Sequence, residues 1–236
     1  MPELPDLQVF SRNLTKRLKG KKLKTIRVKN KKKLAVSERK LNDAFGKQKL
    51  IGVQREGKEL HFRFSNGQVL GLHMMLRGKL HYFENKNEER FTILEMEFSD
   101  GTGVAITDYQ GQATPTLNPV VKSSPDALSP SINFTFLKNI LNNSRAAIKN
   151  LLLDQSIVRG IGNAYADEIL WETRISPFST SSKIPDRAIK KLSKAIHTVL
   201  QSATRHIART HPDIIGGEVR DFLKIHNAEK KVSPTG

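Results

Sequence analysis

The stretch "DQSIVRGIGNAYADEIL" (residues 154–170) joins two runs in which apolar residues recur at helical spacing. Gly160 and Gly162 carry no side chain, so the backbone between the runs can turn tightly. A new helix is expected to start at about Asn163 or Ala164, with Asn163 a good N-cap residue. Such a turn leaves backbone N–H groups and the positive end of the helix open to an anion. An ordinary helical hairpin with closely packed glycines is the alternative.

The same period of 3.6 residues continues through the rest of the C-terminal half. Helical patterns occupy "FTFLKNIL", "RAAIKNLLLDQ", "AYADEILWETR" and "DRAIKKLSKAIHTVLQSATRHIA". The last has an apolar stripe made by Ile189, Leu192, Ile196, Val199, Ala203 and Ile207. Upstream, residues 115–131 are rich in Pro and Ser and indicate a linker. We therefore predict a helical domain at 132–236 that contains a helix–two-turns–helix segment.

The N-terminal half has a different pattern. Residues 5–18 read as a helix whose buried face is formed by Leu7, Phe10, Leu14 and Leu18. Beyond it, "KELHFRF" and "TILEMEF" alternate apolar with polar residues, and the turns "SNG" and "SDG" follow them. Hairpins at this spacing favour an antiparallel sandwich or barrel. The predicted fold class is α+β: an N-terminal helix and an antiparallel β-sandwich domain at 1–114, a linker at 115–131, then the helical domain.

The charge and composition of the chain indicate which kind of ligand it binds. The 236 residues carry a formal net charge of +17, which calls for a polyanion, with nucleic acid ahead of anionic lipid. No run approaches the roughly 20 apolar residues of a membrane span, and no signal peptide is visible. The absence of cysteine excludes disulfides and cysteine-ligated metal, so we expect no metal site. The absence of cysteine fits a reducing cytoplasmic setting (nucleoid-associated if the source is bacterial), and we expect a monomer.

The N-terminus offers reactive chemistry. If Met1 is removed, which the small residue behind it favours, the secondary amine of Pro2 becomes a nucleophile beside the carboxylate of Glu3. Lys58 stands at the head of the strand "KELHFRF" and shares the parity of its apolar residues. Taken singly, each residue has an ordinary interpretation: a chain start, a helix-dipole partner and a solvated lysine.

Several of these segments together resemble the formamidopyrimidine-DNA glycosylase / endonuclease VIII family of base-excision repair enzymes. "PELPD" resembles the family's N-terminal signature, and residues 151–177 resemble its helix–two-turns–helix segment. "EGKEL" falls where the family has its strand lysine, and "GGEVRDFL" resembles the segment after the long helix. The resemblance spans nearly the whole chain. It implies a bifunctional DNA glycosylase and apurinic-site lyase that needs no cofactor and acts on damaged or abasic duplex DNA.

The resemblance also implies roles for individual residues. Pro2 would attack the sugar C1′ and form a Schiff base, Glu3 would be the general acid–base, and Lys58 would assist β-elimination or hold a phosphate. The implied DNA-binding residues are His73, Lys149, Gly160, Gly162 and Asn163.

Three departures from the family pattern concern the gap left by the flipped nucleotide, which the family fills with a Met, an Arg and a Phe. Leu76 falls at the Met position, with Met75 and Met74 as neighbours that could substitute, although core packing of this cluster is an alternative. "DYQGQA" (residues 108–113) replaces "DPRRFG" and lacks both the Arg and the Phe. Tyr109, Gln110 and Gln112 are the unranked substitutes there.

The family's C-terminal zinc finger, or its metal-free equivalent, would begin at about Gly236, where the given sequence ends. Truncation and loss of the module are both open.

Other functions stay open. One alternative is a non-catalytic or weakly catalytic protein of the same fold that binds damaged or abasic DNA. Another is a basic RNA-associated protein. The lesion and the preferred opposite base are not specified by any motif.

Overall fold

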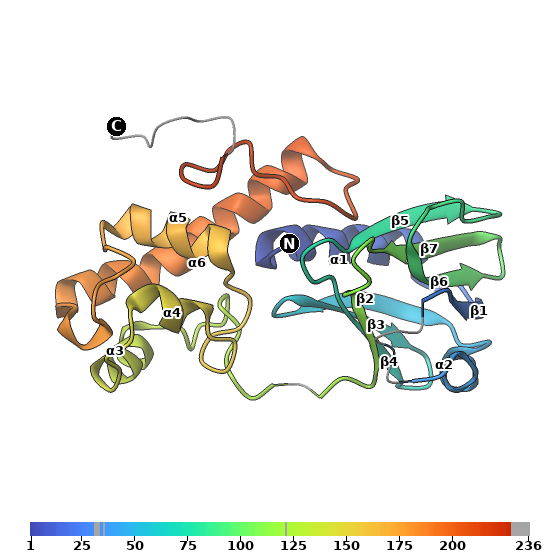
Figure 1. Cartoon of the computed structure of the whole chain (residues 1–236), viewed down its shortest axis with the longest axis horizontal. Coiled ribbons are helices and arrows are strands. Elements are labelled where there is room, and N and C mark those ends of the chain that lie inside the picture. Colours follow the sequence, from blue (N-terminus) through green and yellow to red (C-terminus); the bar gives the residue numbers. More distant parts are fainter. Residues whose placement is uncertain (31–33, 35, 121, 228–236) are drawn as a thin grey trace. The chain divides into compact units, whose positions relative to one another are not determined.

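The computed structural model describes residues 1–30, 34, 36–120 and 122–227, which form two compact units (Figure 1). The first unit contains Met1–Pro2, Asp6–Val121 and Ala208–Glu218. The second contains Glu3–Pro5, Lys122–Ile207 and the residues that follow Glu218. Both units are therefore assembled from segments that lie far apart in the sequence.

The first unit combines two antiparallel four-stranded sheets with helix α1, as the sequence predicted. The strand orders are β1-β6-β7-β5 and β2-β3-β4-β8. Its elements are α1 (Leu4–Leu18), β1 (Leu23–Val28), α2 (Glu38–Phe45), β2 (Leu50–Glu56), β3 (Glu59–Phe64), β4 (Val69–His73), β5 (Lys79–Glu84), β6 (Thr92–Phe98), β7 (Thr102–Thr107) and β8 (Thr114–Leu117). Apolar residues of both sheets and of α1 share one core, which makes the unit a β-sandwich.

Helix α1 buries the face that its periodicity predicted. Leu7, Phe10, Leu14 and Leu18 are fully buried, and Gly20 follows the helix with a φ of +85° that suits glycine. These leucines and Phe10 pack in the sandwich core. The start of the chain is thus attached to the first unit through an extensive apolar contact.

Strict alternation fails in β6, where Glu95 and Glu97 are buried alongside the apolar residues. Arg27 of the neighbouring strand β1 lies 3.1 Å from Glu95, and Lys24 lies 2.5 Å from Glu97. The hydrogen bond from Lys24 lowers the pKa of the Glu97 carboxyl. Cross-strand ion pairs therefore allow these carboxylates to be buried, which a strand pattern read alone does not reveal.

Strand β8 begins the segment that the sequence indicated as a linker. It pairs with β4 along the edge of its sheet, a position where Pro115 removes no required hydrogen bond. Further along the same segment, Ala127 is buried in the core of the second unit. The segment at 115–131 thus contributes residues to both units.

The second unit is helical, as predicted. It contains α3 (Phe134–Asn142), α4 (Ile148–Leu153), α5 (Asn163–Thr173), the short helix η1 (Ser181–Lys183) and α6 (Asp186–Thr210) up to Ile207. Its core includes Leu4 from the chain start and the fully buried Tyr165 of α5. None of the helices in the described ranges is long and apolar enough to cross a membrane.

After α6 the chain returns to the first unit. Ile215 is buried in the sandwich core, and the side-chain amide of Asn13 donates a 2.7 Å hydrogen bond to the carbonyl of Ile214. Arg17 donates to the carbonyl of Asp213. These contacts with α1 lie just before Gly217 and Glu218, which line a cavity of the first unit.

Candidate functional site

Pro2 is buried and lines a cavity of about 840 Å³ in the first unit. The rest of the lining comes from residues 76–79 after β4, 90–91 before β6, 107–109 at the end of β7, and 217–218. Loops from several strands therefore converge on the residue that the sequence singled out as the nucleophile.

The N-terminal ammonium group of Met1 pairs with the carboxylate of Glu218. Glu218 also lines the cavity that contains Pro2. The carboxylate of Glu218 thus lies at the chain start. No motif indicated this contact, because it joins residues 217 positions apart.

The turn after β4 determines how Leu76 is presented. Met75 has a φ of +50°, and its N–H donates a 3.1 Å hydrogen bond to Nδ1 of His73. Gly78 closes the turn, since a Cβ there would lie 2.2 Å from the carbonyl oxygen of Met74. Met74 is buried in the core, whereas Leu76 is 59% exposed and lines the cavity. Met75, the other predicted void-filling residue, is not part of the lining.

The loop at residues 108–113 is organised by one buried carboxylate. Asp108 accepts hydrogen bonds of 2.8–2.9 Å from the backbone N–H groups of Gln110, Gln112 and Ala113. Tyr109 is left exposed at the cavity, and neither glutamine lines it. Of the three substitutes that the sequence left unranked, Tyr109 is the one beside Pro2.

Lys58 and His73 lie elsewhere on the first unit. Lys58 occupies the turn between β2 and β3 rather than the head of the strand, because Gly57 adopts a φ of +58° and reverses the chain there. The register pairs Glu59 with His73, so Lys58 and His73 share one end of the sheet. Neither residue lines the Pro2 cavity.

Glu3 belongs to the second unit and is almost completely buried. Its carboxylate accepts hydrogen bonds from the N–H groups of Ala164 (3.0 Å) and Tyr165 (3.3 Å) in the first turn of α5. The positive end of the helix dipole adds to this stabilisation of negative charge. The predicted anion site at this helix start is thus occupied by a side chain of the same protein.

The prediction that Asn163 is the N-cap was wrong. Gly162 is the N-cap and Asn163 is the first helical residue, because Glu3 supplies the capping acceptor from a distant part of the chain. A Cβ at Gly162 would lie 2.3 Å from the carboxyl carbon of Glu3. At Gly160, with a φ of +103°, it would lie 2.6 Å from Leu4. Both glycines therefore make room for residues 3 and 4, and DNA binding by them stays a prediction.

Lys149 and Asn163 meet in a cluster on α4 and α5. The ammonium of Lys149 lies 2.7 Å from one oxygen of Asp167, and His226 lies 2.6 Å from the other. The amide nitrogen of Asn163 is 3.4 Å from the same imidazole nitrogen of His226. The structure thus brings two predicted phosphate-binding residues together and adds His226, which no motif indicated.

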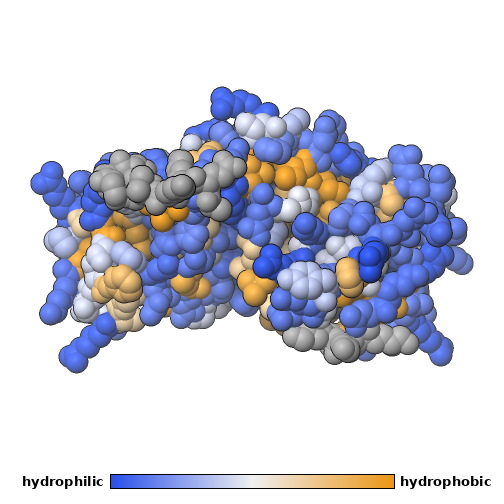
Figure 2. Space-filling model, turned by 45° about the horizontal axis from the view of Figure 1, so that its top comes forward, coloured by the Kyte–Doolittle hydropathy of each residue, from blue (hydrophilic) through white to orange (hydrophobic). Residues whose placement is uncertain are grey.

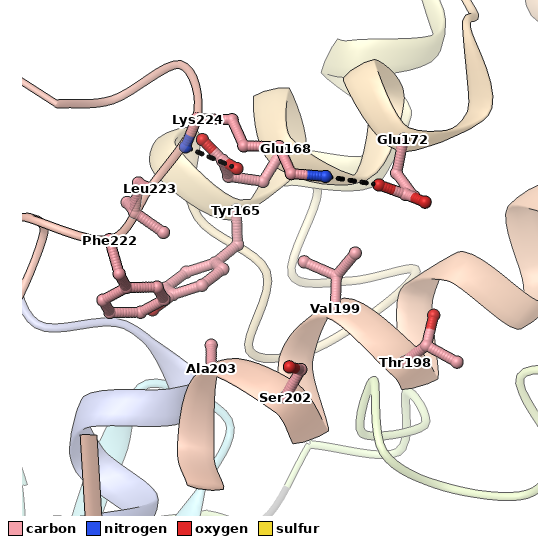
Figure 3. Close-up of a pocket in the computed structure, with 10 residues that line it drawn as sticks. All are labelled: Tyr165, Glu168, Glu172, Thr198, Val199, Ser202, Ala203, Phe222, Leu223 and Lys224. Atoms are coloured by element: carbon pink, nitrogen blue, oxygen red, sulfur yellow. Dashed lines mark hydrogen bonds and ion pairs between the residues drawn. The ribbon is translucent and has the colours of Figure 1, made fainter. Parts of the chain in front are cut away.

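A second cavity, of about 360 Å³, separates α5 and α6 from residues 222–224 (Figure 3). Glu168 of α5 accepts hydrogen bonds from the backbone N–H groups of Lys224, Ile225 and His226. Lys224 also forms a 2.9 Å ion pair with Glu172. These contacts hold the segment that carries His226 against α5.

The charge of the surface and the grouping of its His, Asp and Glu side chains bear on which ligands could bind. The face drawn in Figure 2 is mostly hydrophilic, in keeping with 40 Lys and Arg against 23 Asp and Glu in the sequence. Within the described residues, no three His, Asp or Glu side chains gather as they would around a metal ion.

Both halves of the chain are similar to domains of one known enzyme family. A model of the formamidopyrimidine-DNA glycosylase N-terminal domain matches residues 1–114, and a model of the same enzyme's H2TH (helix–two-turns–helix) domain matches residues 124–212. The chain belongs to the formamidopyrimidine-DNA glycosylase family. The first model includes Pro2, Leu76 and Tyr109, and the second includes Lys149 and Asn163.

Relatives in this glycosylase family match over most of their length. The formamidopyrimidine-DNA glycosylase of Pelotomaculum thermopropionicum is 30% identical over 99% of this chain and 91% of the relative. That of Ligilactobacillus salivarius is 34% identical over 86% of this chain and 78% of the relative. The relatedness therefore extends through both units.

Solved structures of the family agree with the fold. The Lactococcus lactis formamidopyrimidine-DNA glycosylase, bound non-covalently to DNA with an AP site, superposes with a TM-score of 0.81 at 26% identity, covering 86% of this chain and 82% of that one. The same enzyme in complex with DNA containing N7-benzyl-Fapy-dG gives a TM-score of 0.80 at 25% identity, covering 86% and 79%.

Proposed function

We propose that this glycosylase-family chain excises damaged bases from duplex DNA and then cleaves the abasic site, using the amine of Pro2 once Met1 is removed. The observation that carries the proposal is the position of Pro2, buried at the wall of a large cavity at the chain start. Arg77, Lys79 and Arg90 in the same lining suit a polyanionic substrate.

The chemistry uses the ring nitrogen as a nucleophile. The amine attacks C1′ of the damaged nucleotide, the glycosidic bond breaks and the base leaves with a proton. Opening of the sugar ring gives an iminium (Schiff base) between the ring nitrogen of Pro2 and C1′. Loss of a proton from C2′ and rupture of the bond between C3′ and its oxygen then cut the strand. An α-amine has an ordinary pKa of roughly 8, so a usable fraction is unprotonated near neutral pH.

Glu3 is proposed as the group that moves protons. It directly follows the nucleophile in the chain, and two N–H donors hold its carboxylate in a fixed orientation. Proton transfer by a positioned carboxylate contributes about 10²- to 10⁴-fold to rate. Lys58 is proposed to assist the elimination step or to bind a phosphate.

The remaining predicted residues are proposed to hold the DNA. Lys149, Asn163 and His73 would bind backbone phosphates, and Leu76 would enter the base stack as an apolar wedge. Leu76 suits that role because its side chain is exposed at the cavity while neighbouring Met74 is buried. We expect a monomer that acts in the cytoplasm, where the DNA of a bacterium lies.

The decisive experiment is borohydride trapping on duplexes that carry abasic sites and a panel of damaged bases. Mass spectrometry first establishes that Met1 is absent. We expect the wild-type protein to form a covalent adduct that maps to Pro2, and the Pro2→Gly variant to form at least tenfold less. A Pro2→Gly protein that traps and cleaves at the wild-type rate would contradict the proposal.

The same experiment tests the alternative of a non-catalytic binder. That alternative predicts tight binding to the abasic duplex with neither adduct nor strand scission over hours, and turnover of any lesion on the panel excludes it. A preference for structured RNA over duplex DNA at equal salt would instead favour the RNA-binding alternative.

A further inference from the structure

Arg90 and Phe91 immediately precede β6 and line the Pro2 cavity. The Phe91 side chain is 59% exposed, although it is a large apolar group. The guanidinium carbon of Arg90 lies 5.4 Å from the centre of the Phe91 ring, which is cation–π distance. An exposed ring next to a planar cation is therefore presented at the site of the proposed chemistry.

The backbone at Phe91 is held in an unfavourable conformation. Its φ is +59°, in the left-handed region that bulky residues seldom adopt. The carbonyl oxygen of Phe91 accepts a 3.0 Å hydrogen bond from the N–H of Asp108, whose side chain organises the loop that bears Tyr109. Strain of this kind persists where the surrounding structure enforces it, and it is found disproportionately at ligand sites.

The chemistry of the pair fits one kind of occupant. Aromatic faces stack on nucleobases with little regard for sequence, and a guanidinium both stacks and attracts phosphate. Arg77 and Lys79 contribute further positive charge to the cavity lining. Burial in the sandwich core does not account for Phe91, since it is absent from that core and largely exposed.

We propose that Arg90 and Phe91 form a nucleobase-stacking site that receives the base left unpaired when the damaged nucleotide leaves the duplex. The proposal rests on the proposed function and deepens it. No motif pointed to this pair, whereas the loop at residues 108–113 lacks both the Arg and the Phe that the family pattern carries. The preceding loop thus supplies an Arg and a Phe to the same cavity.

The test uses a duplex with a tetrahydrofuran abasic-site analogue opposite 2-aminopurine, whose fluorescence falls when it stacks. Phe91→Ala and Phe91→Leu both remove the aromatic face, and Phe91→Leu keeps an apolar side chain of similar reach. Ile51→Ala is the control, because Ile51 is also exposed and lies on β2, outside the cavity lining. Thermal melting checks that each variant is folded.

The expected result is a loss of affinity of about tenfold in both Phe91 variants, since stacking on an aromatic side chain is worth roughly that much per base. Quenching of 2-aminopurine should disappear in parallel, with Ile51→Ala unchanged in both measurements. Arg90→Gln should lower the slope of log affinity against log salt by about one, the value for one phosphate contact, while Phe91→Leu should leave the slope unaltered.

The outcomes distinguish failure of the stacking site from failure of the proposed glycosylase function. If the wild-type protein prefers the abasic duplex over undamaged DNA and both Phe91 variants bind and quench as it does, the stacking site is refuted while the proposed function stands. If the wild-type protein shows no preference for the abasic duplex, both are refuted.

Discussion

Glu3 and Phe91 mark two regions that the fold treats in opposite ways. Glu3 is 4% exposed and its carboxylate is fixed by two N–H donors from α5, with Gly162 leaving just enough space for it. Phe91 is 59% exposed on a strained backbone beside an open cavity. The hydrogen bonds of the first region are satisfied within the protein, whereas the second presents exposed apolar surface at the cavity.

The difference indicates that proton transfer and DNA stacking in the proposed reaction need side chains in different environments. Groups that move protons gain from fixed hydrogen bonds, because a positioned carboxylate needs no rearrangement as the reaction proceeds. Groups that stack on an unpaired nucleobase gain from exposure, because their apolar faces become buried only when DNA is bound. Substitutions in the two regions should therefore affect different measurements.

The largest effect is expected for Glu3→Gln. Loss of the proton-transfer group should slow base excision by about 10²- to 10⁴-fold under single-turnover conditions, with affinity for an abasic-site duplex changed far less. Glu172→Gln is the matched control, because Glu172 is an exposed carboxylate that pairs with Lys224 in the same unit. Equal rates for Glu3→Gln and Glu172→Gln would remove the distinction between the two regions.

A smaller effect, on stability, is expected for Gly162→Ala. The new Cβ would lie 2.3 Å from the Glu3 carboxyl carbon, so the substitution should lower the free energy of unfolding by about 1–3 kcal/mol. Gly52→Ala is the control, since its Cβ would make an ordinary 3.5 Å contact with Thr15. Denaturant unfolding compares them, and similar midpoints would show that the Glu3 region is looser than described.

The smallest effect is expected for Phe91→Gly, which should raise the free energy of unfolding rather than lower it. Glycine removes the strain of the left-handed backbone, so unfolding should require about 0.5–1 kcal/mol more while DNA binding weakens. Tyr109→Gly should instead destabilise the protein slightly, because Tyr109 is not among the residues with positive φ. Thermal unfolding of the two variants gives the comparison, and a loss of stability in Phe91→Gly would argue against stored strain.

Much of the fold followed from local periodicity. The buried face of α1 and the positions of strands β3 and β6 are determined by spacings of a few residues, which a sequence displays directly, whereas the burial of Glu95 and Glu97 in β6 is not. The family's N-terminal and helix–two-turns–helix domains were also recognisable from contiguous motifs, and the comparisons confirmed them.

The site was less predictable because its decisive contacts connect distant residues. Asn163 had the chemistry of an N-cap, but Glu3 accepts hydrogen bonds from N–H groups of the first helical turn, that of Ala164 from 161 residues away. Glu218 reaches the N-terminus across 217 residues. Phe91 gave no signal at all, because neither its exposure nor its positive φ can be read from the residues around it in the sequence.

The return of residues Ala208–Glu218 to the first unit has a consequence for synthesis on the ribosome. The β-strands emerge early, but the piece that brings Gly217 and Glu218 to the cavity is translated only after the whole helical region. At roughly 5–20 residues per second, that delay is on the order of ten seconds. The first unit of the nascent chain therefore stays incomplete until these residues have been translated, although all its strands are already made.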